Sequence, residues 1–180
     1  MGTIFVDNIK QQSSQGSGTI TIGASGETVA LASGVKQSNL MYPAFEVNLQ
    51  GQSFNVATNT DTKVIMTNEV ADTDSAYDTS TGRFTPQKAG RYYCYGRISF
   101  DATSDFDNIV INLKKNGTIF AQSYGRNFFY NTLPAYGIAS FNGSSDYLEL
   151  FVIQVAGGTQ GLLDSGNGGT TMFGAYRIGA

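Results

Sequence analysis

The chain has 180 residues, enough for one ordinary domain with a small appendage but not for two full domains. Charged residues make up 14% of it, below the ~25% usual for soluble domains, while Gly occurs 22 times, Phe 12 times and Tyr 10 times. This composition favours strands and turns and argues against a mainly helical protein.

The charge pattern argues against two classes of partner. The net charge is -3, the sequence pI is about 4.8, and the 11 Lys and Arg residues form no basic run, so we expect no nucleic-acid partner. No stretch of the sequence approaches the ~18 continuous apolar residues of a membrane span, so we expect no membrane insertion. The first residues do not resemble a secretory signal, which predicts that the protein stays in the cytoplasm of the cell that makes it.

Residues 1–38 contain short apolar groups separated by Ser and Gly. Each group is too small to form a core, because an isolated hairpin is only marginally stable in water. We therefore expect an N-terminal attachment arm of short β segments that docks onto a larger structure; a disordered polar tail is the alternative. The candidate anchoring residues are Ile4, Val6, Ile9, Ile20 and Ile22.

Residues 42–180 show the period-two alternation of longer strands. Between two of the expected strands, Asn116-Gly117 predicts a hairpin, because this pair readily adopts the two positive φ angles of a type I′ turn. Strands at this spacing predict an antiparallel all-β sandwich, jelly roll or barrel. The expected strands are 44–49, 62–70, 90–100, 108–115, 118–124, 136–141, 147–155 and 171–178.

Two of these strands are apolar on more than the face that a core needs. Strand 90–100 carries Tyr92, Cys94, Ile98 and Phe100 on one face, and aromatic residues alternate with arginines on the other. In strand 147–155 both faces are apolar, which favours a subunit interface. Cover by a loop of the same chain, such as 128–130, is the alternative. The candidate interface residues are Tyr93, Tyr95, Tyr147, Phe151, Ile153 and Val155.

The run from Tyr77 to Cys94 resembles the signature of the C1q-like globular domain. The family has an aromatic residue where Cys94 stands, and the resemblance extends over about 42–180. It implies a jelly-roll sandwich of the C1q/tumour-necrosis-factor type that assembles as a homotrimer. The residues at the family's spacing are Gly82, Phe84, Pro86, Gly90 and Tyr92.

The arm resembles a different group of proteins. The sequence has no collagen-like Gly-X-Y repeat, and segments 4–9 and 18–22 resemble the amino-terminal β segments of bacteriophage fibre and decoration proteins. This resemblance implies a phage virion structural protein, made in the host cytoplasm and displayed on the virion surface as a trimeric capsid decoration, head fibre or short fibre. The arm would bind a capsid or tail protein. The alternatives are a tail fibre receptor-binding tip and a non-viral carbohydrate-binding or spore-surface C1q-like protein.

The sequence offers little for catalysis. It contains no His, and Cys94, its single cysteine, lies on an apolar strand face and excludes an intrachain disulfide. We expect no enzyme activity, no catalytic residues, no cofactor and no metal site. The aspartates at 72, 74, 78, 101, 105 and 107 are interpreted as solvated turn residues, with calcium binding as the alternative.

Exposed aromatic residues are the candidates for contact with a host surface glycan or protein. They are Tyr124, Phe128, Phe129 and Tyr130, and packing of the same side chains within a trimer is the alternative.

Overall fold

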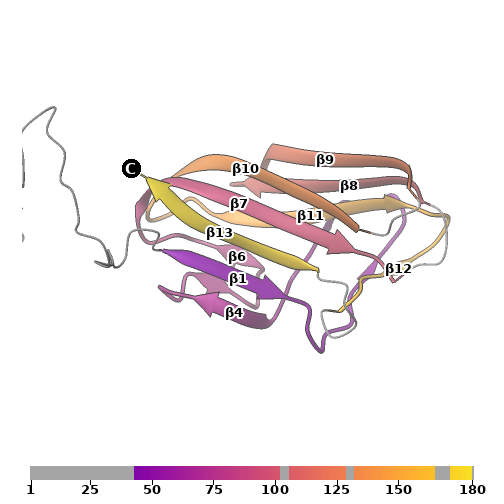
Figure 1. The fold of residues 1–180 in the computed structure, drawn as a ribbon, viewed down its shortest axis with the longest axis horizontal. Coiled ribbons are helices and arrows are strands. Elements are labelled where there is room, and N and C mark those ends of the chain that lie inside the picture. The colour runs from indigo at the N-terminus through magenta and orange to yellow at the C-terminus, as the bar shows by residue number, and fades with distance from the viewer. Residues whose placement is uncertain (1–42, 102–105, 129–131, 165–170, 180) are drawn as a thin grey trace, which may run out of the picture. The chain divides into compact units, whose positions relative to one another are not determined.

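The structure, a computed structural model, describes residues 43–101, 106–128, 132–164 and 171–179 (Figure 1). These residues form strands, turns and connecting segments, and they include no helix. Accordingly, no helix in this part of the chain is long and apolar enough to cross a membrane. The predicted arm, 1–38, and its five anchoring residues lie outside the described residues.

Most of the strands form two antiparallel sheets, as predicted (Figure 1). The first sheet has the order β10-β7-β13-β1-β4, and the second has the order β5-β6-β11-β8-β9 with β3 also paired to β11. A separate pair joins β12 to β2. The bounds are β1 Ala44–Asn48, β2 Asn55–Val56, β3 Thr62–Lys63, β4 Asn68–Asp72, β5 Tyr77–Asp78, β6 Arg83–Phe84, β7 Ala89–Ser99, β8 Phe106–Lys115, β9 Thr118–Phe128, β10 Thr132–Asn142, β11 Leu148–Val155, β12 Gln160–Gly161 and β13 Met172–Gly179.

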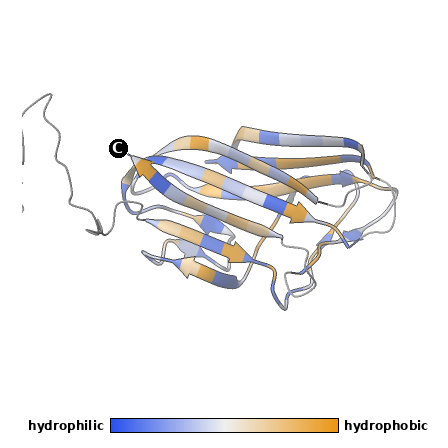
Figure 2. Cartoon of the chain, in the orientation of Figure 1, coloured by the Kyte–Doolittle hydropathy of each residue, from blue (hydrophilic) through white to orange (hydrophobic). Residues whose placement is uncertain are grey.

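The core lies between the two sheets and is built on aromatic rings. Phe45 of β1 stacks on Phe84 of β6 with ring centroids 4.1 Å apart, and it meets Phe173 of β13 edge-on at 5.0 Å. All three are fully or almost fully buried. Such aromatic pairs contribute about 0.5–1.5 kcal/mol each beyond the area that they bury. Buried and partly buried residues alternate along β1, and apolar and polar residues follow one another there, as a two-sided strand requires (Figure 2).

The predicted core face of the strand 90–100 is confirmed. Tyr92, Cys94, Ile98 and Phe100 are completely buried. The position between them is Gly96, where a Cβ would lie 2.6 Å from a methyl carbon of Leu150. The second sheet therefore packs into a gap that only glycine leaves open in β7.

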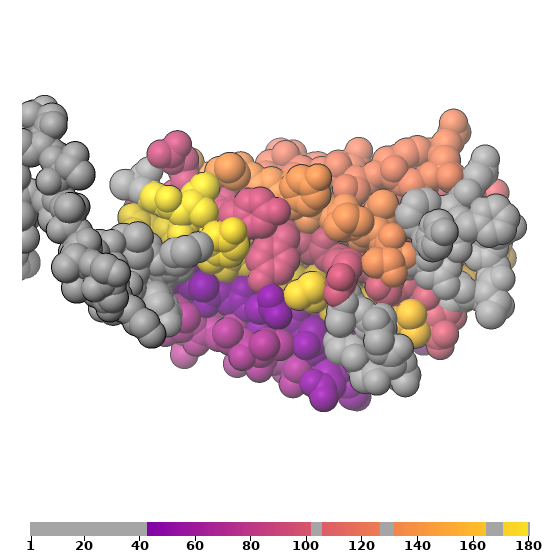
Figure 3. Space-filling model, in the orientation of Figure 1, coloured from indigo at the N-terminus to yellow at the C-terminus, as the bar shows by residue number. Residues whose placement is uncertain are grey.

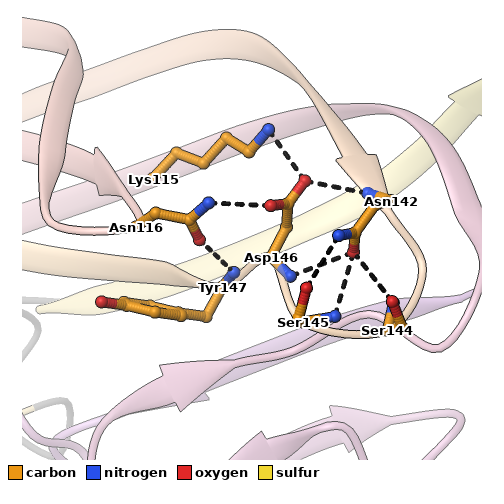
Figure 4. A network of polar contacts seen from close by, with 7 residues as sticks. All are labelled: Lys115, Asn116, Asn142, Ser144, Ser145, Asp146 and Tyr147. Carbon is orange, nitrogen blue, oxygen red and sulfur yellow. Dashed lines mark hydrogen bonds and ion pairs between the residues drawn. The ribbon is translucent and has the colours of Figure 1, made fainter.

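The turn of the β8–β9 hairpin is tied to the turn that joins β10 of the first sheet to β11 of the second (Figure 4). Asn116 and Gly117 have φ angles of 51° and 78°, which confirms the predicted turn between β8 and β9. Asn116 donates to the Asp146 carboxylate at 2.7 Å and accepts from the Tyr147 backbone at 2.9 Å. Asp146 also accepts from Lys115 at 2.9 Å. These bonds fix the turn before β11 against the turn after β8.

The prediction of one strand at 62–70 is wrong. Residues 62–63 form β3 in the second sheet and 68–72 form β4 in the first, so the chain crosses between the layers at 64–67. Val64 still donates its backbone N–H to the Leu150 carbonyl of β11, but at 65–67 side chains take the hydrogen bonds that a strand partner would provide. Gln52 donates to the Ile65 carbonyl and accepts from the Thr67 N–H, and the Tyr77 hydroxyl bonds the backbone of Met66.

Candidate functional site

The outward side of the first sheet carries a cluster of tyrosines that we call the tyrosine face. Tyr93 of β7 lies at its centre, with ring centroids 5.4 Å from Tyr176, 6.1 Å from Tyr95 and 6.5 Å from Tyr136. The register explains the cluster, because Tyr136 lies opposite Tyr95 and Tyr176 lies opposite Tyr93. Cross-strand neighbours on one face of a sheet are close enough for such rings to touch. The tyrosine face consists of Tyr93, Tyr95, Tyr136, Ile138 and Tyr176.

Tyr95 reaches across the neighbouring strand β13 to β1. Its hydroxyl donates a hydrogen bond to the Glu46 carboxylate at 2.7 Å. The ring crosses Gly174, where a Cβ would lie 2.4 Å from the hydroxyl oxygen. Burial, reinforced by the Glu46 carboxylate, raises the pKa of Tyr95 well above its usual value. The Tyr95 hydroxyl therefore remains protonated and holds the aromatic cluster against three strands.

Part of the tyrosine face is open to solvent. Tyr136 is 65% exposed and Ile138 is 59% exposed, both on β10. Beside the cluster, a shallow groove of about 330 Å³ is lined by side chains that include Ala44, Val70 and Tyr176. Figure 3 views the molecule from this side, with residues of β7, β13 and β1 meeting in the middle of the surface. Large exposed apolar groups concentrated on one sheet are typical of an association surface.

The six predicted interface residues do not share one surface. Tyr93 and Tyr95 lie on the tyrosine face, on β7 of the first sheet. The remaining four lie on or beside β11 in the second sheet, so they belong to the opposite layer of the sandwich. These four are Tyr147, Phe151, Ile153 and Val155, and all are partly buried.

Charged groups of the same chain cover part of the outward side of β11. Glu149 is almost completely buried, and its carboxylate accepts from Lys63 at 3.0 Å and Arg83 at 2.9 Å. Lys114 lies 3.6 Å from the ring centroid of Phe151. Burial opposes ionisation of Glu149, but the hydrogen bonds from Arg83 and Lys63 outweigh it and lower the pKa of that carboxyl. Intrachain cover therefore accounts for part of the apolar character of this strand.

The predicted host-contact residues fall in and after β9. Tyr124 is 52% exposed on the second sheet, and its hydroxyl donates to the Asn108 side chain. Phe128 ends β9, whereas Phe129 and Tyr130 lie outside the described residues. Tyr124 is thus available to a partner on the layer opposite the tyrosine face.

The structure explains the thiol and two of the six candidate aspartates. Burial raises the pKa of the Cys94 thiol to about 12, so it remains a protonated core residue. Asp72 and Asp78 accept hydrogen bonds from the turns that follow them, and Asp105 lies outside the described residues. Among the residues that the structure describes, no three His, Cys, Asp or Glu side chains gather to hold a metal ion.

Several residues of the tyrosine face were not predicted. Tyr136 and Ile138 share one side of the expected strand 136–141, so the alternation placed them together but did not say which side faces outward. Tyr176 and Glu46 become neighbours of the cluster only through the pairing of β13 with β7 and β1. The strand order of the sheet is information that local alternation does not contain.

Comparisons with known proteins identify the fold. Neither protein-family models nor curated protein sequences match the chain. Among solved structures, murine APRIL at pH 5.0 matches with a TM-score of 0.53 at 13% identity, over 75% of this chain and 98% of that chain. Eiger TNF from S. frugiperda matches with a TM-score of 0.52 at 14% identity, over 75% of this chain and 91% of that chain.

The globular domain of zebrafish complement 1qA also matches, with a TM-score of 0.48 and 17% identity over 76% of this chain and 97% of that chain. Identities this low establish a fold and nothing finer. The described part of the chain is an antiparallel jelly roll of the C1q/tumour-necrosis-factor type, as the sequence predicts.

Proposed function

We propose that this chain is a homotrimeric surface module whose copies associate through the tyrosine face. The observation that carries the proposal is the cluster around Tyr93, with Tyr136 and Ile138 largely exposed beside it. Tyrosine is enriched in the cores of protein interfaces because it supplies apolar area at a low cost in side-chain entropy. The C1q-like resemblance of the sequence supports the same assembly.

The shape of the tyrosine face suits a closed ring of copies. In a cyclic trimer each interface joins two different patches, so each subunit needs one patch that projects and a second patch that receives the projecting patch of its neighbour. Tyr136 and Ile138 project from β10 at one edge of the first sheet, and the groove beside Val70 lies toward the other edge, at β4. A trimer in which one subunit's β10 meets the next subunit's groove would bury both.

Light scattering on the purified chain tests the association directly. The proposal expects a mass of about three times 19.2 kDa. A monomer at micromolar concentration contradicts the assignment of the tyrosine face as an interface.

We further propose that the trimer is a structural protein of a bacteriophage virion, with no enzyme activity. Residues 1–38 would anchor it to a capsid or tail protein, and the jelly roll would project from the virion surface as a decoration or short fibre after synthesis in the host cytoplasm. The support is the sequence of the arm, with the apolar groups around Ile4 and Ile20. The alternative is a tail fibre tip, in which the arm would anchor the protein to the tail and the jelly roll would bind a host receptor.

Electron cryomicroscopy of the particle tests this location. The proposal expects threefold density of the jelly roll on the head or the tail, with density for the arm in contact with the particle. Absence of the protein from purified virions contradicts it.

A non-viral carbohydrate-binding or spore-surface protein is the second candidate. The two solved structures cited above, murine APRIL and Eiger TNF from S. frugiperda, are animal proteins, so the fold fits a cellular protein as well as a viral one. Antibody labelling of spores or cell envelopes of the source organism separates the two candidates, because a virion protein is found on phage particles.

A further inference from the structure

The described domain has two distinct ends. Arg177, near the end of β13, donates its backbone N–H to the carbonyl of Pro43 at 3.1 Å, so the chain leaves the first sheet beside the point where it enters. At the other end of β7, the Ser99 backbone N–H donates a hydrogen bond at 3.1 Å to the hydroxyl oxygen of Thr171, the residue just before β13. The eleven residues of β7 separate these ends by roughly 33 Å. We call the end at Ser99 the distal end.

A pocket of about 370 Å³ opens at the distal end. Its walls come from the loop 51–55 after β1, from Asp101 after β7, and from residues 161–164 at and after β12. Backbone hydrogen bonds join these segments: Asp101 donates to Gly161 and Leu162 donates to Phe54, both at 2.8 Å. The pocket is therefore formed by connected backbone and does not depend on a ligand for its shape.

The lining of the pocket is rich in hydrogen-bond acceptors. Asp101 is exposed, and its carboxylate forms no hydrogen bond or ion pair with the described residues. Asn55 is exposed, and its side-chain amide oxygen lies over Gly161, 3.6 Å from the position that a Cβ on Gly161 would take. No Lys or Arg is present among the described lining residues, so the pocket is unsuited to an anion. It favours a ligand that donates several hydrogen bonds.

A sugar fits this lining better than a metal ion. Calcium needs six to eight oxygen ligands, about half of them from closely placed carboxylates, and the described residues bring no three acidic side chains together. The volume is at the lower end of the range for ligand pockets and suits a single ring. Half-buried Phe54 and buried Leu162 provide apolar surface for the C–H face of that ring.

We propose that the distal pocket binds a neutral hexose unit of a glycan, with Asp101 and Asn55 accepting hydrogen bonds from its hydroxyl groups. This inference deepens the proposed function, because it gives the projecting end of the module a glycan as its partner. The pocket lies within one chain, so binding does not require the trimer.

The test uses the full chain in buffer with EDTA. Glucose, galactose and N-acetylglucosamine are titrated by ligand-observed NMR, and a glycan array extends the panel. We expect at least one hexose to bind, and Asp101→Ala to weaken binding at least tenfold, because a charged acceptor is lost. Asn55→Ala, in an exposed loop, should weaken it as well. Asp107→Ala is the matched control, since Asp107 is an exposed aspartate on β8 that is not among the residues lining the pocket.

Three results would overturn the proposal: no binding on the array or by NMR, equal binding by wild type and both pocket variants, or binding that appears only when calcium replaces EDTA in the buffer. Light scattering on the same samples reports the trimer separately. A monomer that still binds hexose would contradict the assembly and leave the pocket assignment supported.

Discussion

Tyr95 and Gly174 are a matched pair: the tyrosine ring lies across the glycine, in the space that any side chain at 174 would occupy. A Cβ at this position would also lie 2.8 Å from the Phe45 carbonyl oxygen, which is backbone and cannot move aside as a side chain does. Tyr95 therefore reaches Glu46 only because residue 174 has no side chain.

Gly174→Ala should displace Tyr95 from Glu46 and disturb both the fold and the trimer. Overpacking of this kind costs roughly 1–3 kcal/mol of unfolding free energy. Urea denaturation measures the loss of stability, and light scattering at decreasing concentration measures the loss of trimer. Gly158→Ala is the control, because nothing lies within 4 Å of a Cβ placed there. Equal behaviour of the two variants would show that the close approach at 174 is unimportant.

Tyr136→Asp should shift the trimer toward monomer while leaving the monomer folded. Tyr136 is 65% exposed, so the fold loses little, but a charge buried in a subunit interface is costly to desolvate. We expect at least a tenfold rise in the concentration at which subunits dissociate, measured by sedimentation. Tyr124→Asp changes a tyrosine of similar exposure on the other sheet and should have no such effect. If Tyr124→Asp dissociates the trimer instead, the second sheet forms the interface.

Glu149→Ala should destabilise the jelly roll by about 2 kcal/mol, because it leaves Lys63 and Arg83 without their shared partner. Breaking a fully buried ion pair costs about 3–5 kcal/mol, and the expected value is lower because the two cations are partly exposed. Chemical denaturation at pH 7 measures the change. The control is Glu69→Ala, an exposed carboxylate on β4, which should stay within about 0.5 kcal/mol of the wild type.

Asp78 should contribute stability that disappears in acid. Hydrogen bonds from the Ser80 and Thr81 side chains, with help from their backbone N–H groups, lower the pKa of Asp78 to about 2. In the unfolded chain an aspartate has a pKa of about 3.9. A lowered pKa in the folded state stabilises the fold above about pH 4, and this stabilisation is lost as the pH falls through about 2.

The measurement compares the urea midpoints of the wild type and Asp78→Asn between pH 7 and pH 2. The two midpoints should differ at pH 7 and converge near pH 2. A difference that is the same at every pH would mean that the turn depends on side-chain shape and not on the charge of Asp78.

The sequence was a good guide to strands and a partial guide to the surface that they form. Alternation located β7 and β13 to within a residue or two at each end, and Asn116-Gly117 located the hairpin, because these signals are local. The segment 64–67 also alternates, with Val64 and Met66 buried, but the backbone hydrogen bonds of 65–67 go to the side chains of Gln52 and Tyr77. Alternation reports which residues are buried and does not report which groups pair with the backbone.

The second apolar side of the strand 147–155 illustrates a related limit. Periodicity showed that Phe151 and Ile153 share a side, but it did not show that Lys114 and the Glu149 cluster would lie beside them. The two groups of predicted interface residues came from different layers because sheet membership is decided by partners far away in the sequence. Tyr93 could be predicted as an outward aromatic residue; its neighbours Tyr136 and Tyr176 required the sheet order.

The hydrogen bond from Arg177 to Pro43 has a practical consequence for handling this protein. It brings the carboxyl-terminal strand to the same end of the jelly roll as the incoming chain, a full strand length from the distal pocket. A tag or surface linker added after residue 180 is therefore attached at the end of the domain that holds Arg177 and Pro43. An immobilised preparation made in this way leaves the opposite end accessible to ligands in solution.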